Sequence, residues 1–95
     1  MSILNWLIEW YSSQCDGDWE HCYGVKIYTA DNPGWCVDID ILGTSVEGKE
    51  FSLFQYDNGD ADWIICKVKD GRFIGAGDSS KLEEIIQIFK EWVEQ

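Results

Sequence analysis

The densest cluster of side chains that could do chemistry lies in the first quarter of the chain. It is the run Asp16-Gly-Asp-Trp-Glu-His21, with Cys15 before it and Cys22 after it. Its three alternating acids resemble the start of a calcium loop, but His21 and Ile27 replace the glycine and glutamate that such a loop needs. Structural zinc sites typically use pairs of cysteines with two or three residues between them, and the four cysteines contain no such pair. We therefore expect neither a metal nor any other cofactor.

Acid–base catalysis near neutral pH would depend on His21, because it is the only histidine in the chain. A nucleophilic mechanism would also need a thiol beside it and a third group to orient the pair, and the sequence indicates neither. If the role of this cluster is structural and not catalytic, we expect Glu20 and His21 to hold the loop after the first helix against the sheet. The alternative to a non-enzymatic function is a small hydrolase or metal-dependent enzyme centred on Asp16, Asp18, Glu20 and His21.

The elements that must position these residues follow from hydrophobic periodicity. Apolar residues at positions 3, 6, 7, 10 and 11 predict an amphipathic helix that Ser2 can cap and that ends near Gln14. Near the other end, Ser80-Lys-Leu-Glu83 matches a capping box, and an apolar stripe follows it over residues 82–93. The sequence therefore predicts a helix at each end of the chain.

Five strands are predicted between these helices, at residues 23–30, 35–41, 50–56, 63–68 and 73–76. The turns between them are mostly short, as at Asp31-Asn-Pro-Gly34 and Lys69-Asp-Gly-Arg72, and short turns require antiparallel pairing. The long strands have only one consistently apolar face, so both helices should cover the same face of the sheet. The prediction is a single α+β domain over residues 1–95, in the order α-β-β-β-β-β-α.

The chain contains six tryptophans among its 95 residues, which indicates either a large aromatic core or a binding surface. Four of them fall on predicted core stripes, whereas Trp19 and Trp63 lie beside acidic residues and are the candidates for exposure. We expect one nearly fully buried cluster that includes Trp35, Ile39, Ile85, Phe89 and Trp92.

The charge of the chain is strongly acidic and unevenly distributed. There are 18 acidic and 7 basic residues, for a net charge of −11, and most of the excess precedes Trp63. Such a field repels the phosphates of nucleic acids and of anionic membranes, and it accelerates association with basic proteins. We therefore expect a basic protein partner, and neither nucleic acid nor membrane.

The start of the chain does not match a secretory signal, because it lacks a basic region and Glu9 interrupts its apolar run. No segment approaches the roughly 18 apolar residues that a membrane span needs. These features predict a cytoplasmic monomer whose four cysteines are reduced.

Several blocks of the sequence carry a resemblance to a known family. They are Trp10-Tyr11, Cys15-Asp-Gly-Asp-Trp-Glu-His21 with Tyr23-Gly24, Asp31-Asn-Pro-Gly-Trp35, Asp62-Trp63-Ile64 with Cys66-Lys67-Val68, and Phe73 with Gly77-Asp78. Together they resemble the immunity protein 53 family, and they extend over nearly the whole chain. The resemblance implies a small α+β protein of a bacterial polymorphic-toxin system, which protects the cell by binding a cognate toxin without catalysis. It assigns no contact residues.

The site can be predicted from strand alternation. If both helices cover one face of the sheet, the other face is open and acidic, and it could bind a basic toxin such as a nuclease. The residues expected on this face or at its rim are Tyr28, Asp38, Asp40, Phe54, Asp57, Asp60 and Asp62. A second candidate patch consists of Asp16, Asp18, Trp19, Glu20 and His21.

Overall fold

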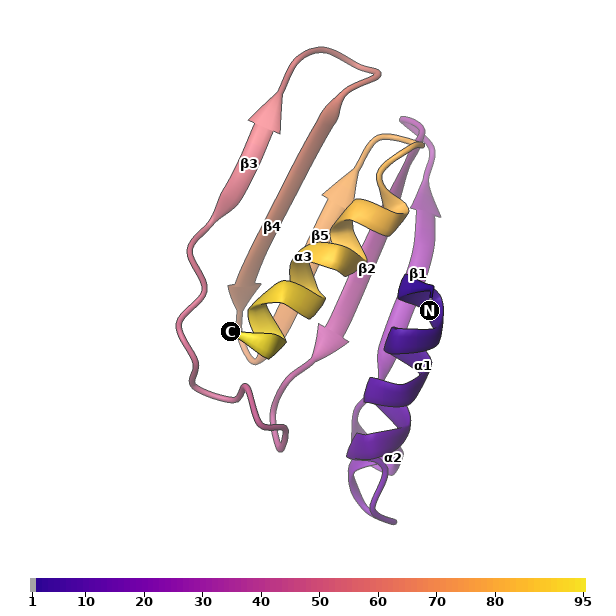
Figure 1. Ribbon diagram of the computed structural model, residues 1–95. Helices are drawn as coiled ribbons and strands as arrows, with labels where there is room; N and C mark the ends of the chain where they lie inside the picture. The colour runs from indigo at the N-terminus through magenta and orange to yellow at the C-terminus, as the bar shows by residue number, and fades with distance from the viewer. Residues whose placement is uncertain (1) are drawn as a thin grey trace.

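A five-stranded sheet carries two long helices on one of its faces in the computed structural model, which describes residues 2–95 (Figure 1). The helices are α1 (Ile3–Gln14), the single-turn α2 (Trp19–Cys22) and α3 (Leu82–Glu94). The strands are β1 (Val25–Ala30), β2 (Gly34–Asp40), β3 (Phe54–Asp57), β4 (Trp63–Lys69) and β5 (Arg72–Gly77).

The strands lie in the order β1-β2-β5-β4-β3, and every neighbouring pair is antiparallel. The predicted hairpin between β4 and β5 is confirmed: Asp70 and Gly71 have φ of 55° and 76°, as a two-residue type I′ turn requires. Gly77, the last residue of β5, lies opposite Trp35 at the start of β2 and opposite Ile64 at the start of β4. The β1–β2 and β3–β4 turns therefore lie at the same end of the sheet.

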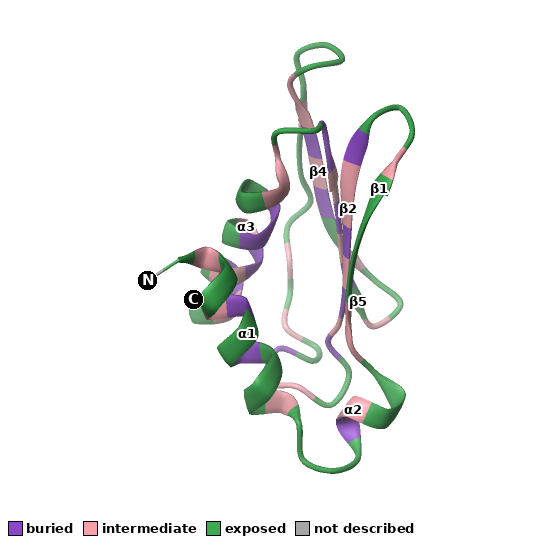
Figure 2. Ribbon diagram, turned by 90° about the vertical axis from the view of Figure 1, so that its right-hand side faces the viewer, coloured by how far each residue is buried: buried purple, intermediate pink, exposed green. Residues whose placement is uncertain are grey.

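Both long helices lie on the same side of the sheet, as predicted (Figure 2). The α+β architecture with a terminal helix at each end and an antiparallel sheet is thus confirmed. Between the sheet and α3 the packing is close at Gly75, where an added Cβ would overlap the Ile85 side chain. The glycine lets α3 approach the central strand β5.

Most of the predicted core is confirmed. Ile39, Ile85, Phe89 and Trp92 are buried in one cluster together with residues of α1 and β5. The expectation for Trp35 is wrong: it is only half-buried, at the end of the sheet, and its indole N–H donates to the Ser79 carbonyl oxygen at 3.1 Å. Trp35 does lie on the same face of β2 as the buried Val37 and Ile39. It is opposite Gly77, however, so it lies beside the β5–α3 connection and is not covered by α3, which begins only at Leu82.

Three elements differ from the sequence prediction. The short helix α2 was not predicted. The third strand was predicted from residue 50, but β3 begins at Phe54. The preceding segment is instead held by α3, because the Trp92 indole N–H donates to the Glu50 carbonyl oxygen at 2.8 Å. The capping box does not form, because the Ser80 hydroxyl donates to Asp78 Oδ1 at 2.6 Å and α3 starts without a side-chain cap. None of the helices within residues 2–95 is long and apolar enough to cross a membrane.

Candidate functional site

The face of the sheet opposite α1 and α3 is left uncovered by these helices (Figure 2), and we call it the open face. It is formed by alternate residues of the five strands, whose neighbours in the chain point toward the helices. The pairing register assigns to it Lys26, Tyr28, Cys36, Asp38, Asp40, Gln55, Asp57, Trp63, Ile65, Lys67, Lys69, Arg72, Ile74 and Ala76.

An apolar row crosses the middle of the open face. Tyr28 pairs with Cys36, Cys36 with Ala76, and Ala76 with Ile65, so the four side chains lie side by side across four strands. Tyr28 is 48% exposed, and the other three are partly exposed. The Asp38 carboxylate beside Tyr28 raises the pKa of its phenol. The row places an aromatic ring and aliphatic groups together on the surface, as interface centres do.

Charged residues of both signs flank this row. The open face carries three acids and four of the chain's seven basic residues, Lys26, Lys67, Lys69 and Arg72. The open face is therefore not uniformly acidic: Asp38 and Asp40 lie on β2 and Asp57 on β3, whereas the four basic residues lie on β1, β4 and β5. Both ion pairs found within residues 2–95 involve Lys81, so the charges of the open face are not paired with one another.

Several acidic residues lie at the end of the sheet that holds the β1–β2 and β3–β4 turns, and we call it the acidic end. Figure 1 shows these two turns at the same end of the sheet. Asp31 lies in the first turn, and Asp57 and Asp60 lie at the end of β3 and in the second turn. Asp62 is also there, but its carboxylate is 2.8 Å from the Lys81 ammonium, which lowers the pKa of Asp62. Asp57 and Asp60 are the acids of this turn that remain without an ion pair in the described part of the chain.

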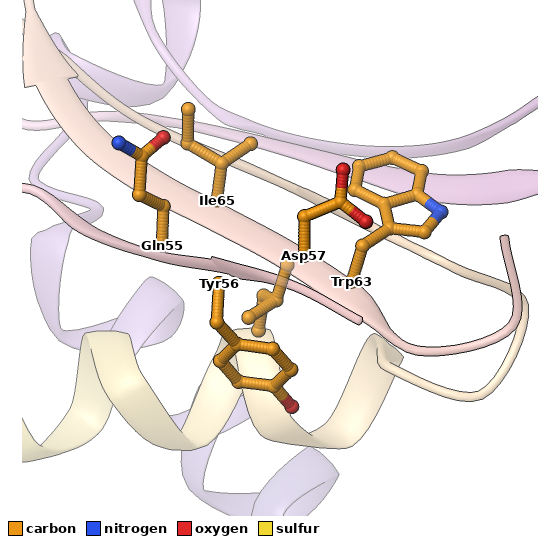
Figure 3. A pocket seen from close by; sticks show the side chains of 6 residues that line it. Gln55, Tyr56, Asp57, Trp63 and Ile65 are labelled. Atoms are coloured by element: carbon orange, nitrogen blue, oxygen red, sulfur yellow. The ribbon is translucent and has the colours of Figure 1, made fainter. Parts of the chain in front are cut away.

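A hollow of about 530 Å³ opens between β3 and β4 near this acidic end. Figure 3 shows the side chains of Gln55, Asp57, Trp63 and Ile65 on one side of the two strands, with Tyr56 on the other. The Asp57 carboxylate lies next to the Trp63 ring in this view. The hollow therefore belongs to the open face and combines aromatic, aliphatic, amide and carboxylate groups.

The placement of Phe54 on the open face is wrong. Phe54 pairs with the buried Cys66, so it lies on the face that carries the helices. Tyr56 lies on the same side, and its hydroxyl donates to the Glu84 carboxylate of α3 at 3.2 Å. In β3 the polar residues Gln55 and Asp57 occupy the open face instead.

The second candidate patch is held together by contacts with its own backbone. Asp16 Oδ1 accepts hydrogen bonds from the N–H groups of Trp19 and Asp18, both at 2.9 Å, and these lower the pKa of Asp16. The Glu20 carboxylate accepts from the N–H groups of Asp16 and Gly17. These carboxylates thus cap the turn that leads into α2, and Asp18 and His21 are exposed beside them.

Trp19 is buried, contrary to the expectation that it is exposed. Its side chain is 5% exposed, and its indole N–H donates to the Leu42 carbonyl oxygen at 2.8 Å. Its ring also packs edge-to-face against Trp10. Trp19 therefore anchors the α1–β1 connection to the core. Within residues 2–95, no group of three or more histidine, cysteine or acidic side chains is arranged to hold a metal ion.

The sequence reasoning missed a buried aspartate that positions the acidic end of the open face. Asp78 is 2% exposed, and its carboxylate accepts hydrogen bonds from the Trp63 N–H at 2.9 Å and from the N–H and hydroxyl of Ser80. The Lys81 ammonium bridges Asp62 and Asp78 at 2.8 and 2.9 Å, and both contacts raise the pKa of Lys81. These contacts join the β3–β4 turn to the start of α3.

Asp78 should make the stability of the protein depend on pH. Its hydrogen bonds, those from Ser80 first, hold the pKa of Asp78 well below its usual range. The ionised carboxylate therefore stabilises the fold above the pKa of an unfolded aspartate, about 3.9, and this contribution is lost as the pH falls toward the folded value. We expect Asp78→Asn to lower the unfolding temperature at about pH 7.

The same substitution should make unfolding less sensitive to acid. The gap in unfolding temperature between wild type and Asp78→Asn should narrow from about pH 5 to about pH 2, as followed by circular dichroism. Asp60→Asn, in the neighbouring turn, is the matched control and should leave the unfolding temperature nearly unchanged at both ends of this range. A gap that stays constant with pH would contradict the role given to the Asp78 charge.

Comparison with known protein families identifies the class of this α+β domain as immunity proteins. The family model for immunity protein 53 matches residues 4–94. The chain belongs to the immunity protein 53 family. No curated protein and no solved structure matches it.

Family membership confirms the resemblance seen in the sequence and implies that the chain neutralises a toxin. The implied partner is the cognate toxin, and proteins of this class are typically non-enzymatic. Asp16 and Glu20, on which the enzymatic alternative was centred, both accept hydrogen bonds from the local backbone.

Proposed function

We propose that this chain neutralises its cognate toxin by binding it directly through the open face. The observation that supports the proposal is the apolar row formed by Tyr28, Cys36, Ala76 and Ile65 on a sheet surface that neither α1 nor α3 covers. Interface centres combine such apolar groups with a surrounding ring of polar and charged side chains. The open face has this arrangement.

A sheet face also suits the task of an inhibitor because it is preorganised. Many of the open-face side chains project from β2, β5 and β4, each of which pairs with a neighbouring strand on both sides. Little conformational entropy is therefore lost from the backbone when a partner binds, and less of the contact energy is offset.

The charges around the row favour a basic toxin. The chain as a whole carries −11, and the acids Asp57 and Asp60 lie at one end of the open face. A net charge of this size steers a basic partner toward the surface and raises the association rate. A nuclease fits this description, because nucleases need basic surfaces to hold phosphates.

Asp38 offers the sharpest test of this electrostatic component. Its carboxylate has only a long contact of 3.5 Å with the Tyr28 hydroxyl, whereas that of Asp40 accepts a 2.9 Å hydrogen bond from the Gly24 N–H. Replacing Asp38 therefore changes the charge of the open face with little change in structure. We expect Asp38→Lys to slow association with the cognate toxin several-fold at low ionic strength, and to reduce the salt dependence of association.

The measurement is stopped-flow or biosensor kinetics with an inactive form of the cognate toxin domain. Glu91→Lys is the matched control, because it makes the same change of charge on the exposed side of α3. Equal slowing by the two variants would show that only the net charge matters and that the open face is not the binding surface. Circular dichroism verifies that both variants are folded.

A further inference from the structure

The hollow between β3 and β4 has a composition that fits one kind of side chain. Its lining includes Ile65, Trp63, Asp57 and Gln55, which Figure 3 shows on the same side of the strands. The side chains of Trp63 and Ile65 are partly exposed, so an aromatic ring and an aliphatic group are open to solvent beside a carboxylate and an amide.

The polar groups of the hollow are fixed in place yet still have capacity to bind. Asp57 Oδ1 accepts a hydrogen bond from the Gly59 N–H at 3.0 Å, which orients the carboxylate. Asp57 Oδ2 and the Gln55 amide make no hydrogen bond to any other group within residues 2–95. An ordered carboxylate with a free oxygen is a ready acceptor for a charged donor.

The backbone of Trp63 is held in place by the buried Asp78. Its N–H donates to Asp78 Oδ2 at 2.9 Å, and its carbonyl oxygen accepts from the Asp78 N–H at 3.1 Å. The buried Asp78 thus binds both the N–H and the carbonyl group of Trp63. The backbone from which the indole projects beside Asp57 is therefore fixed before any partner arrives, which reduces the entropy lost on binding.

We infer that this hollow receives an arginine side chain of the cognate toxin. A guanidinium group can stack on the indole of Trp63 and donate two hydrogen bonds to the Asp57 carboxylate, while its aliphatic stem covers Ile65. This step rests on the proposed function, because it names the chemistry that the open face recognises.

The surrounding charges favour a cation over other occupants. Asp60 lies in the same turn as Asp57. The cation of the open face nearest to the hollow along β4, Lys67, is two residues or about 7 Å from Ile65, but four residues or about 13 Å from Trp63, which pairs with Asp57. An anionic group would be repelled by Asp57. A purely apolar group would leave that carboxylate buried without a partner, at a large desolvation cost.

The test compares two isosteric changes in one turn. Asp57→Asn removes the charge from the hollow and keeps a side-chain oxygen for the Gly59 N–H, whereas Asp60→Asn removes the same charge outside the lining. We expect Asp57→Asn to raise the Kd for the inactive cognate toxin domain about tenfold, and Asp60→Asn to leave it within about twofold. Isothermal titration calorimetry at fixed ionic strength measures both constants.

A double-mutant cycle identifies the residue in the hollow. Each interface arginine of the toxin is changed to lysine, and the loss of affinity is measured against wild type and against Asp57→Asn. One arginine should lose most of its effect in the Asp57→Asn background, because the two changes remove the same interaction.

The outcomes separate this inference from the proposed function. If the toxin binds the open face but Asp57→Asn and Asp60→Asn act alike, or no arginine couples to Asp57, the inference is overturned while the proposed function stands. If the wild-type chain does not bind the toxin, or binds it away from the open face, the proposed function and the inference both fail.

Discussion

Phe89→Ala is expected to lower the free energy of unfolding by about 3–5 kcal/mol, a large fraction of the stability of a typical domain. Phe89 is fully buried on α3, and it contacts both α1 and the sheet in the core. Its ring lies 5.0 Å from those of Trp10 in α1 and Phe73 in β5, and 5.9 Å from that of Trp6. Truncation removes contacts to a helix and to the sheet simultaneously and leaves a cavity.

Urea denaturation followed by tryptophan fluorescence measures this loss. The control is Gln87→Ala, an exposed position on the same helix, which should change the free energy of unfolding by less than about 0.5 kcal/mol. A loss below about 1 kcal/mol for Phe89→Ala would mean that α3 does not pack on the sheet through this residue.

The long elements of the fold could be predicted from sequence because each has a strong periodic signal. In β2, the buried Val37 and Ile39 alternate with the half-buried Asp38 and Asp40, so the order of residue types alone indicates the strand and its two faces. The stripe of α3 is equally regular, with Ile85, Phe89 and Trp92 all buried. Such patterns depend only on neighbours in the chain.

The assignment of β3 failed because its signal is short. The strand has four residues, and the predicted strand over 50–56 was too long by the segment that packs against the end of α3. The alternation of Phe54 and Tyr56 with Gln55 and Asp57 contained the correct answer, with the aromatic residues toward the helices. Phe54 was instead interpreted as an exposed aromatic anchor, which placed the wrong face of β3 outward. The hollow beside Trp63 was therefore not predicted.

The burial of Trp19 and of Asp78 could not be predicted because both depend on contacts distant in the chain. Trp19 is buried by Trp10 and by the Leu42 carbonyl group, which lies 23 residues away. Asp78 is charged yet buried, and its bond to the Trp63 N–H spans 15 residues. The local sequence predicted a capping box at Ser80, but the Ser80 hydroxyl binds Asp78, whose carboxylate also holds the end of the β3–β4 turn at Trp63.

The central claim, that the toxin covers the open face, can be tested with a thiol of the apolar row. Cys36 lies on the open face between Tyr28 and Ala76, whereas Cys15 and Cys22 are exposed elsewhere. Cys66 is buried, and burial raises its pKa to about 12, so it stays unreactive near neutral pH. In a Cys15→Ser/Cys22→Ser variant, alkylation therefore reports on Cys36.

The rate of Cys36 alkylation by iodoacetamide, followed by mass spectrometry with and without the inactive toxin domain, is the most direct measurement. With free toxin at about 100 times the Kd, only about 1% of the chain is unbound, so the rate should fall about 100-fold. In the control variant Cys22→Ser/Cys36→Ser, the thiol of Cys15 should react at the same rate in both states. An intact complex in which Cys36 reacts as fast as in the free protein would contradict the account.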